Sequence, residues 1–185
     1  MKAAVLVAPK KIDVQDVEKP EIKPNEVLVR AKNCGICTLE QRLFRGDMKI
    51  YYPIVPGHEV SGEVGEVGAD VLSGIEIGTR VAVDLVMRCG ECYYCRTGQS
   101  NMCANRFSKG LRILGGFGEF IAVRASQVYP FSEKLSFEEA ALKENLLAVV
   151  KAIKEAKPST VKGVYVKSIT LTTSMGPGIR LENSS

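Results

Sequence analysis

The chain has 185 residues, with 17 glycines, 8 prolines and no tryptophan, which suffices for one buried core with a small appendage and many turns. Lys and Arg exceed Asp and Glu by four, and this whole excess lies in residues 151–185. The uneven charge indicates a domain boundary, a tail that binds an anion, or a solvated basic face. No run of apolar residues is long enough for a transmembrane helix or a signal peptide, so we expect a cytoplasmic, reducing location.

Short β-prone runs separated by turn residues occupy most of the chain from residue 2 to residue 124. Helical periodicity is weak in this region. Many short strands with glycine-rich turns predict a mainly β fold, either a barrel or a sandwich. The predicted strands are AAVLV, IDVQDV, EVLVRA, EVSGEVGEV, RVAVD and EFIAVRA.

The pattern changes at Ser136. Ser136 and Glu139 have the spacing of a capping box, and an apolar stripe at helical spacing continues from Leu142 to Ile153. A single strand is then predicted at residues 161–173, before the terminating MGPG. We therefore divide the chain into a β domain, 1–136, and a helix-strand tail, 137–185, which has to pack on the β domain or on another chain.

A cluster of cysteines predicts a closed metal site within fifteen residues. The spacing C-x2-C-x2-C-x7-C lets four thiolates converge on one tetrahedral zinc, which would hold a loop rather than take part in a reaction. Two disulfides are the alternative, but short cysteine spacings in a reducing compartment favour metal. The ligands of this structural zinc are Cys89, Cys92, Cys95 and Cys103.

A second, open zinc site is suggested by the only histidine, His58. Glu59 follows it, and Cys37 precedes it by 21 positions, so an imidazole, a carboxylate and a thiolate are available. Three protein ligands and an open position allow zinc to act as a Lewis acid. Cys34 and Cys37 could alternatively form a redox dithiol, although no thioredoxin-like pattern surrounds them, and Cys34 suits a small buried apolar position.

The ordered motifs of residues 1–144 resemble the zinc-dependent medium-chain alcohol and polyol dehydrogenases. These motifs are CGIC, PGHEVSGEVGEVG, CGECYYCRTGQSNMC, GGFGEF and LSFEEAAL. The resemblance implies a GroES-like β-barrel catalytic domain with Cys37, His58 and Glu59 at the catalytic zinc, and Glu144 in the place of a further ligand. Two positions depart from the family: Leu39 stands where a Ser or Thr proton relay is usual, and Asn145 follows Glu144 where proline is usual.

The segment after residue 145 does not resemble a nucleotide-binding domain. It contains no G-x-G-x-x-G between a strand and a helix, and about forty residues are too few for a doubly wound fold. Hydride transfer requires a nicotinamide beside the zinc. We therefore expect that NAD(P) does not bind and that this chain alone does not turn over alcohol.

The tail is similar instead to the C-terminal end of the large-subunit ribosomal protein that forms the stalk beside the transfer-RNA exit site. The similarity spans about residues 143–183 and rests on AKPS, KGVYVKSITLTT and SMGPG. It implies RNA contacts at Ser174, Met175 and Gly176. Because six basic residues give a modest positive field, we do not expect RNA to be a partner, and any RNA binding should be weak and sensitive to salt.

The two resemblances meet inside one predicted helix, which indicates a chimera. Three functions follow for testing: a zinc-binding dehydrogenase domain without its coenzyme domain, a weak RNA-binding module, and a folded recombinant without activity. The predicted strand at 161–173 also has an edge that could pair with a second copy of the chain.

Overall fold

The computed structural model describes residues 1–72, 74–108, 114–141, 169–171 and 179–181. The chain forms two compact units. We call residues 1–87 and 106–144 the sheet unit, and residues 88–105 and 145–185 the cysteine-loop unit. The two units are described separately below, and the predicted domain boundary at residue 136 stays a prediction.

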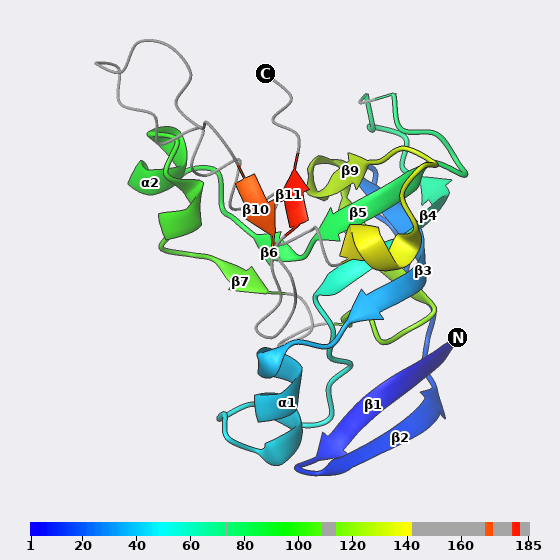
Figure 1. The fold of residues 1–185 in the computed structure, drawn as a ribbon, viewed down its shortest axis with the longest axis vertical. Helices are drawn as coiled ribbons and strands as arrows, with labels where there is room; N and C mark the ends of the chain where they lie inside the picture. Colours follow the sequence, from blue (N-terminus) through cyan, green and yellow to red (C-terminus); the bar gives the residue numbers. More distant parts are fainter. Residues whose placement is uncertain (73, 109–113, 142–168, 172–178, 182–185) are drawn as a thin grey trace. The chain divides into compact units, whose positions relative to one another are not determined.

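A five-stranded antiparallel sheet forms the centre of the sheet unit (Figure 1). Its order is β8-β3-β4-β5-β9, so β8 and β9 are its edges. The prediction of a mainly β fold is confirmed, whereas the pairing among the described residues gives an open sheet rather than a closed barrel. The strands are β3 (Glu26–Gly35), β4 (Glu59–Val67), β5 (Arg80–Asp84), β8 (Phe120–Arg124) and β9 (Val128–Pro130).

Valine dominates the core of this sheet. β-branched side chains fit a pleated surface, and their stiff χ1 angles make them costly in helices. Ten residues, each no more than 6% exposed, form one apolar cluster on the sheet. They are Val27, Val29, Val60, Val64, Val81, Val83, Leu85, Ile121, Val123 and Val128.

Short two-stranded ladders complete the sheet unit. The first two predicted strands form an antiparallel hairpin of β1 (Lys2–Ala8) and β2 (Lys11–Asp16). β6 (Val86–Met87) pairs with β7 (Phe107–Ser108), and these strands precede and follow the cysteine loop in the chain. A 3-10 turn, η2 (Ala125–Gln127), connects β8 to β9.

One helix of the sheet unit was not predicted from the sequence. Helix α1 spans Thr38–Arg45, directly after β3. It begins with Cys37 as N-cap and ends at Gly46, whose φ of 82° is left-handed and therefore suits glycine. The prediction missed α1 because Ser, Thr, Asp and Asn are the usual N-caps, and cysteine is not among them.

The predicted capping box at Ser136 is confirmed. The Glu139 N–H donates to Ser136 Oγ at 3.1 Å, and the Ser136 N–H donates to the Glu139 carboxylate at 2.9 Å. The helix that follows is described for residues 137–141, and the rest of the predicted helix lies outside the described residues.

Arg80 attaches the segment before this helix to β5. Its guanidinium donates to the carbonyls of Glu133 at 3.1 Å and Leu135 at 2.9 Å. It also lies over two aromatic rings, 5.0 Å from the centroid of Phe131 and 4.3 Å from that of Phe137. The Arg80 guanidinium thus holds residues 131–137 against β5 through two hydrogen bonds and two cation-π contacts.

The cysteine-loop unit contains a short helix, α2 (Tyr93–Arg96), and a 3-10 turn, η1 (Ser100–Met102). In the tail, β10 (Ile169–Leu171) pairs antiparallel with β11 (Ile179–Leu181). The prediction of a single tail strand without a partner is therefore wrong, because β10 pairs with a second strand beyond MGPG. Among the described residues, no helix is long and apolar enough to cross a membrane.

Candidate metal centres

Four sulfur atoms converge in the cysteine loop, as predicted. The Sγ atoms of Cys89, Cys92, Cys95 and Cys103 all lie within 4.8 Å of one another. Cys89 Sγ lies 4.0 Å from Cys95 Sγ and 3.6 Å from Cys103 Sγ. A tetrahedral zinc with Zn–S bonds of about 2.3 Å requires sulfur-sulfur separations of about 3.8 Å. No disulfide joins any of the six cysteines, so the arrangement fits zinc and not the disulfide alternative.

Backbone amides point at these sulfurs. The Cys92 N–H donates to Cys89 Sγ and the Cys89 N–H donates to Cys103 Sγ, both at 3.4 Å. A hydrogen bond from the Cys95 backbone amide to the Cys92 sulfur lowers the pKa of Cys92 to about 6. A hydrogen bond from the Cys89 backbone amide to the Cys103 sulfur likewise lowers the pKa of Cys103. Burial raises the pKa of Cys95 to about 12, and its hydrogen bonds to neighbouring thiols add to the rise. The loop therefore stabilises thiolates at Cys92 and Cys103, while Cys95 keeps a proton that a cation would displace.

The second predicted cluster also comes together, in the sheet unit. One ligand atom each from Cys37, His58 and Glu59 lies within 4.8 Å of the others. Cys37 Sγ is 3.8 Å from His58 Nε2. The Glu59 residue is 6% exposed and the His58 side chain 17% exposed. The arrangement is consistent with the catalytic zinc site that the resemblance implies.

The backbone brings these three residues together through the pairing of β3 with β4. Gly35 lies opposite Glu59 in this ladder, so the beginning of CGIC lies beside the end of PGHE. A Cβ atom at Gly35 would collide with the Glu59 carboxylate. Gly57, directly before His58, has a φ of 96° and is therefore left-handed. Glycine is therefore needed at position 35 to leave space for the Glu59 carboxylate, and at position 57 to adopt the left-handed backbone directly before His58.

Glu40 belongs to this site although the sequence analysis did not select it. Its Oε1 lies 2.7 Å from His58 Nδ1, and its Oε2 accepts the Cys37 N–H at 3.1 Å. Burial raises the pKa of Glu40, but the hydrogen bond and charge of His58 outweigh it, so the pKa is lowered. Burial raises the pKa of the Cys37 thiol, and the nearby carboxylate of Glu40 adds to this rise. The C-x-x-E spacing, a capping box with cysteine as the cap, was the signal that could have revealed Glu40.

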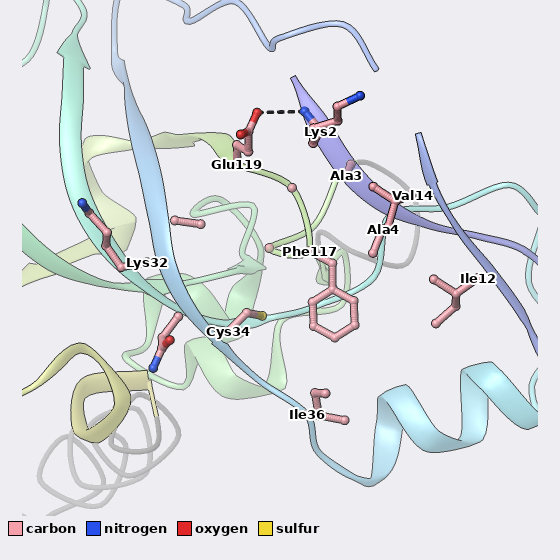
Figure 2. Close-up of a pocket in the computed structure, with 14 residues that line it drawn as sticks. Lys2, Ala3, Ala4, Ile12, Val14, Lys32, Cys34, Ile36, Phe117 and Glu119 are labelled. Atoms are coloured by element: carbon pink, nitrogen blue, oxygen red, sulfur yellow. Dashed lines mark hydrogen bonds between the residues drawn. The ribbon is translucent and has the colours of Figure 1, made fainter. Parts of the chain in front are cut away.

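Cys34 lies apart from both clusters and lines a cavity of about 510 Å³ in the sheet unit. Figure 2 shows its sulfur pointing toward the ring of Phe117, with Ile12 on the far side of that ring. Cys34 is half-buried and packs against the core cluster of the sheet. This position suits the predicted small apolar role.

Leu39, in the place of the usual relay hydroxyl, packs against Leu6, Leu43 and Ile54. It therefore offers apolar contact and no proton path. The other predicted residues are Glu144 and the RNA-contact candidates Ser174, Met175 and Gly176, which lie outside the described residues.

The donor set fits zinc chemically at both centres. Four thiolates give a closed site, and a thiolate, an imidazole and a carboxylate leave a position for a further ligand. A metal ion held by Cys37, His58 and Glu59 would supply Lewis acidity toward an oxygen ligand. The chain's own contribution is orientation, because Glu40 fixes the His58 ring and the Leu39 N–H donates to Cys37 Sγ at 3.2 Å.

Comparison with known proteins identifies two families in this chain. Residues 23–133 match the alcohol dehydrogenase GroES-like domain, and residues 134–177 match the ribosomal protein L1p/L10e family. An alcohol dehydrogenase of Geobacillus stearothermophilus is 41% identical over 145 residues, which are 76% of this chain and 43% of the relative.

Solved structures agree with this result. Galactitol-1-phosphate dehydrogenase from Escherichia coli superposes with a TM-score of 0.76 at 30% identity, covering 83% of this chain and 44% of that one. A cobalt- and zinc-bound thermostable alcohol dehydrogenase from Pyrobaculum aerophilum has a TM-score of 0.69 at 32% identity, covering 76% and 44%. The chain thus spans less than half the length of these relatives. Through its GroES-like domain it belongs to the zinc-type alcohol dehydrogenase family, and the segment that follows matches the ribosomal protein L1p/L10e family.

Proposed function

We propose that this chain carries the zinc-binding catalytic domain of an alcohol or polyol dehydrogenase, with a structural zinc on the cysteine loop and a catalytic zinc on Cys37, His58 and Glu59. The convergence of these three ligand atoms within 4.8 Å is the observation that supports the proposal most strongly. We also propose a cytoplasmic location, and the family match supports a GroES-like domain, of which the described strands form an open sheet. Glu144 is proposed as a further ligand on the resemblance alone.

Metal analysis tests this proposal. We expect the purified chain to bind two zinc ions and His58→Ala to bind one, because this change removes the imidazole of the open site and leaves the four cysteines intact. Inductively coupled plasma mass spectrometry after gel filtration measures both numbers. Glu63→Ala is a matched control, since Glu63 lies on the same strand β4 and bonds a surface lysine, Lys32. One zinc in the wild-type chain would contradict the catalytic site, and none would contradict both sites.

We further propose that the chain is a chimera that does not transfer hydride by itself. The segment following the GroES-like domain matches a ribosomal protein family over residues 134–177. In a dehydrogenase, a coenzyme domain has to present the nicotinamide to the substrate beside the zinc. The proposal therefore combines two of the predicted functions: the chain is a zinc-binding dehydrogenase domain by family, and a folded recombinant without turnover in its activity.

Coenzyme binding is expected to be absent. Titration of the zinc-loaded chain with NADH and with NADPH should give no saturable change in nicotinamide fluorescence up to millimolar coenzyme. A full-length zinc-type alcohol dehydrogenase, titrated in parallel, shows the signal that binding would produce. Saturation at micromolar coenzyme would show that the chain has a nucleotide site after all.

A second candidate function is weak RNA binding through Ser174, Met175 and Gly176. The match of residues 134–177 to the ribosomal protein family favours it, and filter binding to structured RNA at several salt concentrations tests it. We also propose that the tail strand can pair with a second copy of the chain, which sedimentation velocity measures.

A further inference from the structure

The start of helix α1 and the candidate catalytic site use the same atoms. The Cys37 sulfur accepts the Leu39 N–H at 3.2 Å as the helix N-cap, and it also lies 3.8 Å from His58 Nε2. The Glu40 carboxylate accepts the Cys37 N–H with one oxygen and contacts His58 Nδ1 with the other. A movement of the Cys37 sulfur or of the Glu40 carboxylate would therefore disturb both the helix cap and the candidate metal site.

We propose that metal binding at Cys37, His58 and Glu59 is coupled to the folding of α1, with Glu40 as the positioning residue that joins the two events. The inference rests on the proposed zinc site. A metal on His58 Nε2 keeps the ring proton on Nδ1, where it is donated to Glu40. A metal-bound sulfur is a thiolate, which accepts the Leu39 N–H more strongly than a thiol does.

Helix α1 is short enough to depend on this cap. It has eight residues, of which only Glu40 and Leu43 are buried. Isolated helices shorter than about 12 residues are marginal in water, so capping and the packing of Leu43 against Leu6 and Ile54 have to stabilise it. A stronger N-cap therefore has a large relative effect.

The coupling extends to the turn between β1 and β2. The Lys10 N–H donates to the Phe44 carbonyl near the C-terminus of α1 at 2.6 Å. Lys10 has a positive φ of 61°, which is unusual for lysine and has to be held by its surroundings. Ordering of α1 therefore also orders the hairpin turn, next to α1 in Figure 1.

Hydrogen exchange of the full chain, measured by mass spectrometry at increasing zinc, tests the inference. We expect the first equivalent to protect the cysteine loop and the second to slow exchange about tenfold in peptides of residues 39–46 and at Lys10, as expected for a strengthened cap. Glu40→Ala should weaken binding of the second zinc by roughly 10- to 100-fold and remove the zinc-dependent protection of α1. Gln41→Ala, an exposed neighbour in the same helix, should behave like the wild type.

Glu40→Gln separates positioning from folding, because glutamine keeps an oxygen for the Cys37 N–H but lacks the second carboxylate oxygen. We expect it to keep the basal protection of α1 and to lose most of the zinc-dependent gain. Wild-type zinc affinity and protection in Glu40→Gln would overturn the role of the carboxylate. A second zinc that binds without changing exchange in α1 would overturn the coupling alone, whereas a wild-type chain without a second zinc would overturn the proposed function as well.

Discussion

Cys103→Ser is expected to remove one zinc from each chain and to open residues 88–105 to proteolysis. Cys103 is the buried member of the four, 4% exposed, and it brings the end of the loop back to Cys89. Structural zinc contributes roughly 10–16 kcal/mol of apparent binding free energy in small zinc domains. Because α2 has no buried residues, the loop has little apolar packing to replace the lost metal. Zinc content and the rate of tryptic cleavage after Arg96 measure the effect.

Cys34→Ser is the matched control, since it also removes one thiol but lies outside both metal clusters. It should keep both zinc ions and the wild-type rate of cleavage in the loop. Equal zinc contents in the two variants would contradict a four-cysteine site. Faster cleavage of Cys103→Ser with full zinc content would show that Cys103 packs the loop without binding the metal.

Arg80→Ala is expected to lower the free energy of unfolding by about 2–4 kcal/mol. The substitution removes two charge-assisted hydrogen bonds to carbonyls and two cation-π contacts at once. These contacts hold residues 131–137, and the Phe137 carbonyl also accepts the Ser61 hydroxyl at 2.5 Å. Urea denaturation of the zinc-loaded chain, followed by tyrosine fluorescence and circular dichroism, measures the change.

Arg45→Ala provides the comparison for this variant. Arg45 pairs with Asp47, but both side chains are about half exposed, and such surface pairs contribute only about 0–1 kcal/mol. A loss in Arg80→Ala no larger than in Arg45→Ala would mean that the contacts of Arg80 with the two carbonyls and with Phe131 and Phe137 do not stabilise the fold. A loss restored by Arg80→Lys would assign the effect to charge rather than to the planar guanidinium.

The longer strands could be predicted because each has several β-prone residues in a row, whereas β6, β7 and β9, of two or three residues, were not predicted. The run EVSGEVGEV was predicted as one strand, and β4 has the same bounds. The run RVAVD likewise coincides with β5. Helix α1 was missed because its cap is a cysteine and because eight residues are too few for a helical pattern to be recognised in a β-rich stretch. The partner of the tail strand was missed because IRL is too short to be recognised by pattern.

The cysteine loop was predictable because all its ligands lie close together in the chain. The second cluster could be anticipated from residue types, but its assembly depends on the pairing of Gly35 with Glu59 across two strands. Glu40 has no metal-ligand spacing of its own; its capping spacing to Cys37 could have indicated the start of α1, but not the contact with His58 that the folded helix makes. To predict the second cluster fully, one would need the register between β3 and β4 and the placement of Glu40 beside His58, and the spacing of residues in the sequence gives neither.

The two metal centres differ in when a growing polypeptide can build them. The four cysteines lie within fifteen consecutive residues, 89–103. This short loop can therefore close around zinc while the residues after 103 are still being synthesised. The other centre requires the ladder between β3 and β4, which cannot align before both strands have left the ribosome. Residues 26–67 leave the ribosome before residues 89–103, so the strands of the sheet-dependent centre are available first, and the cysteine loop, whose four ligands are local in sequence, can close as soon as Cys103 emerges.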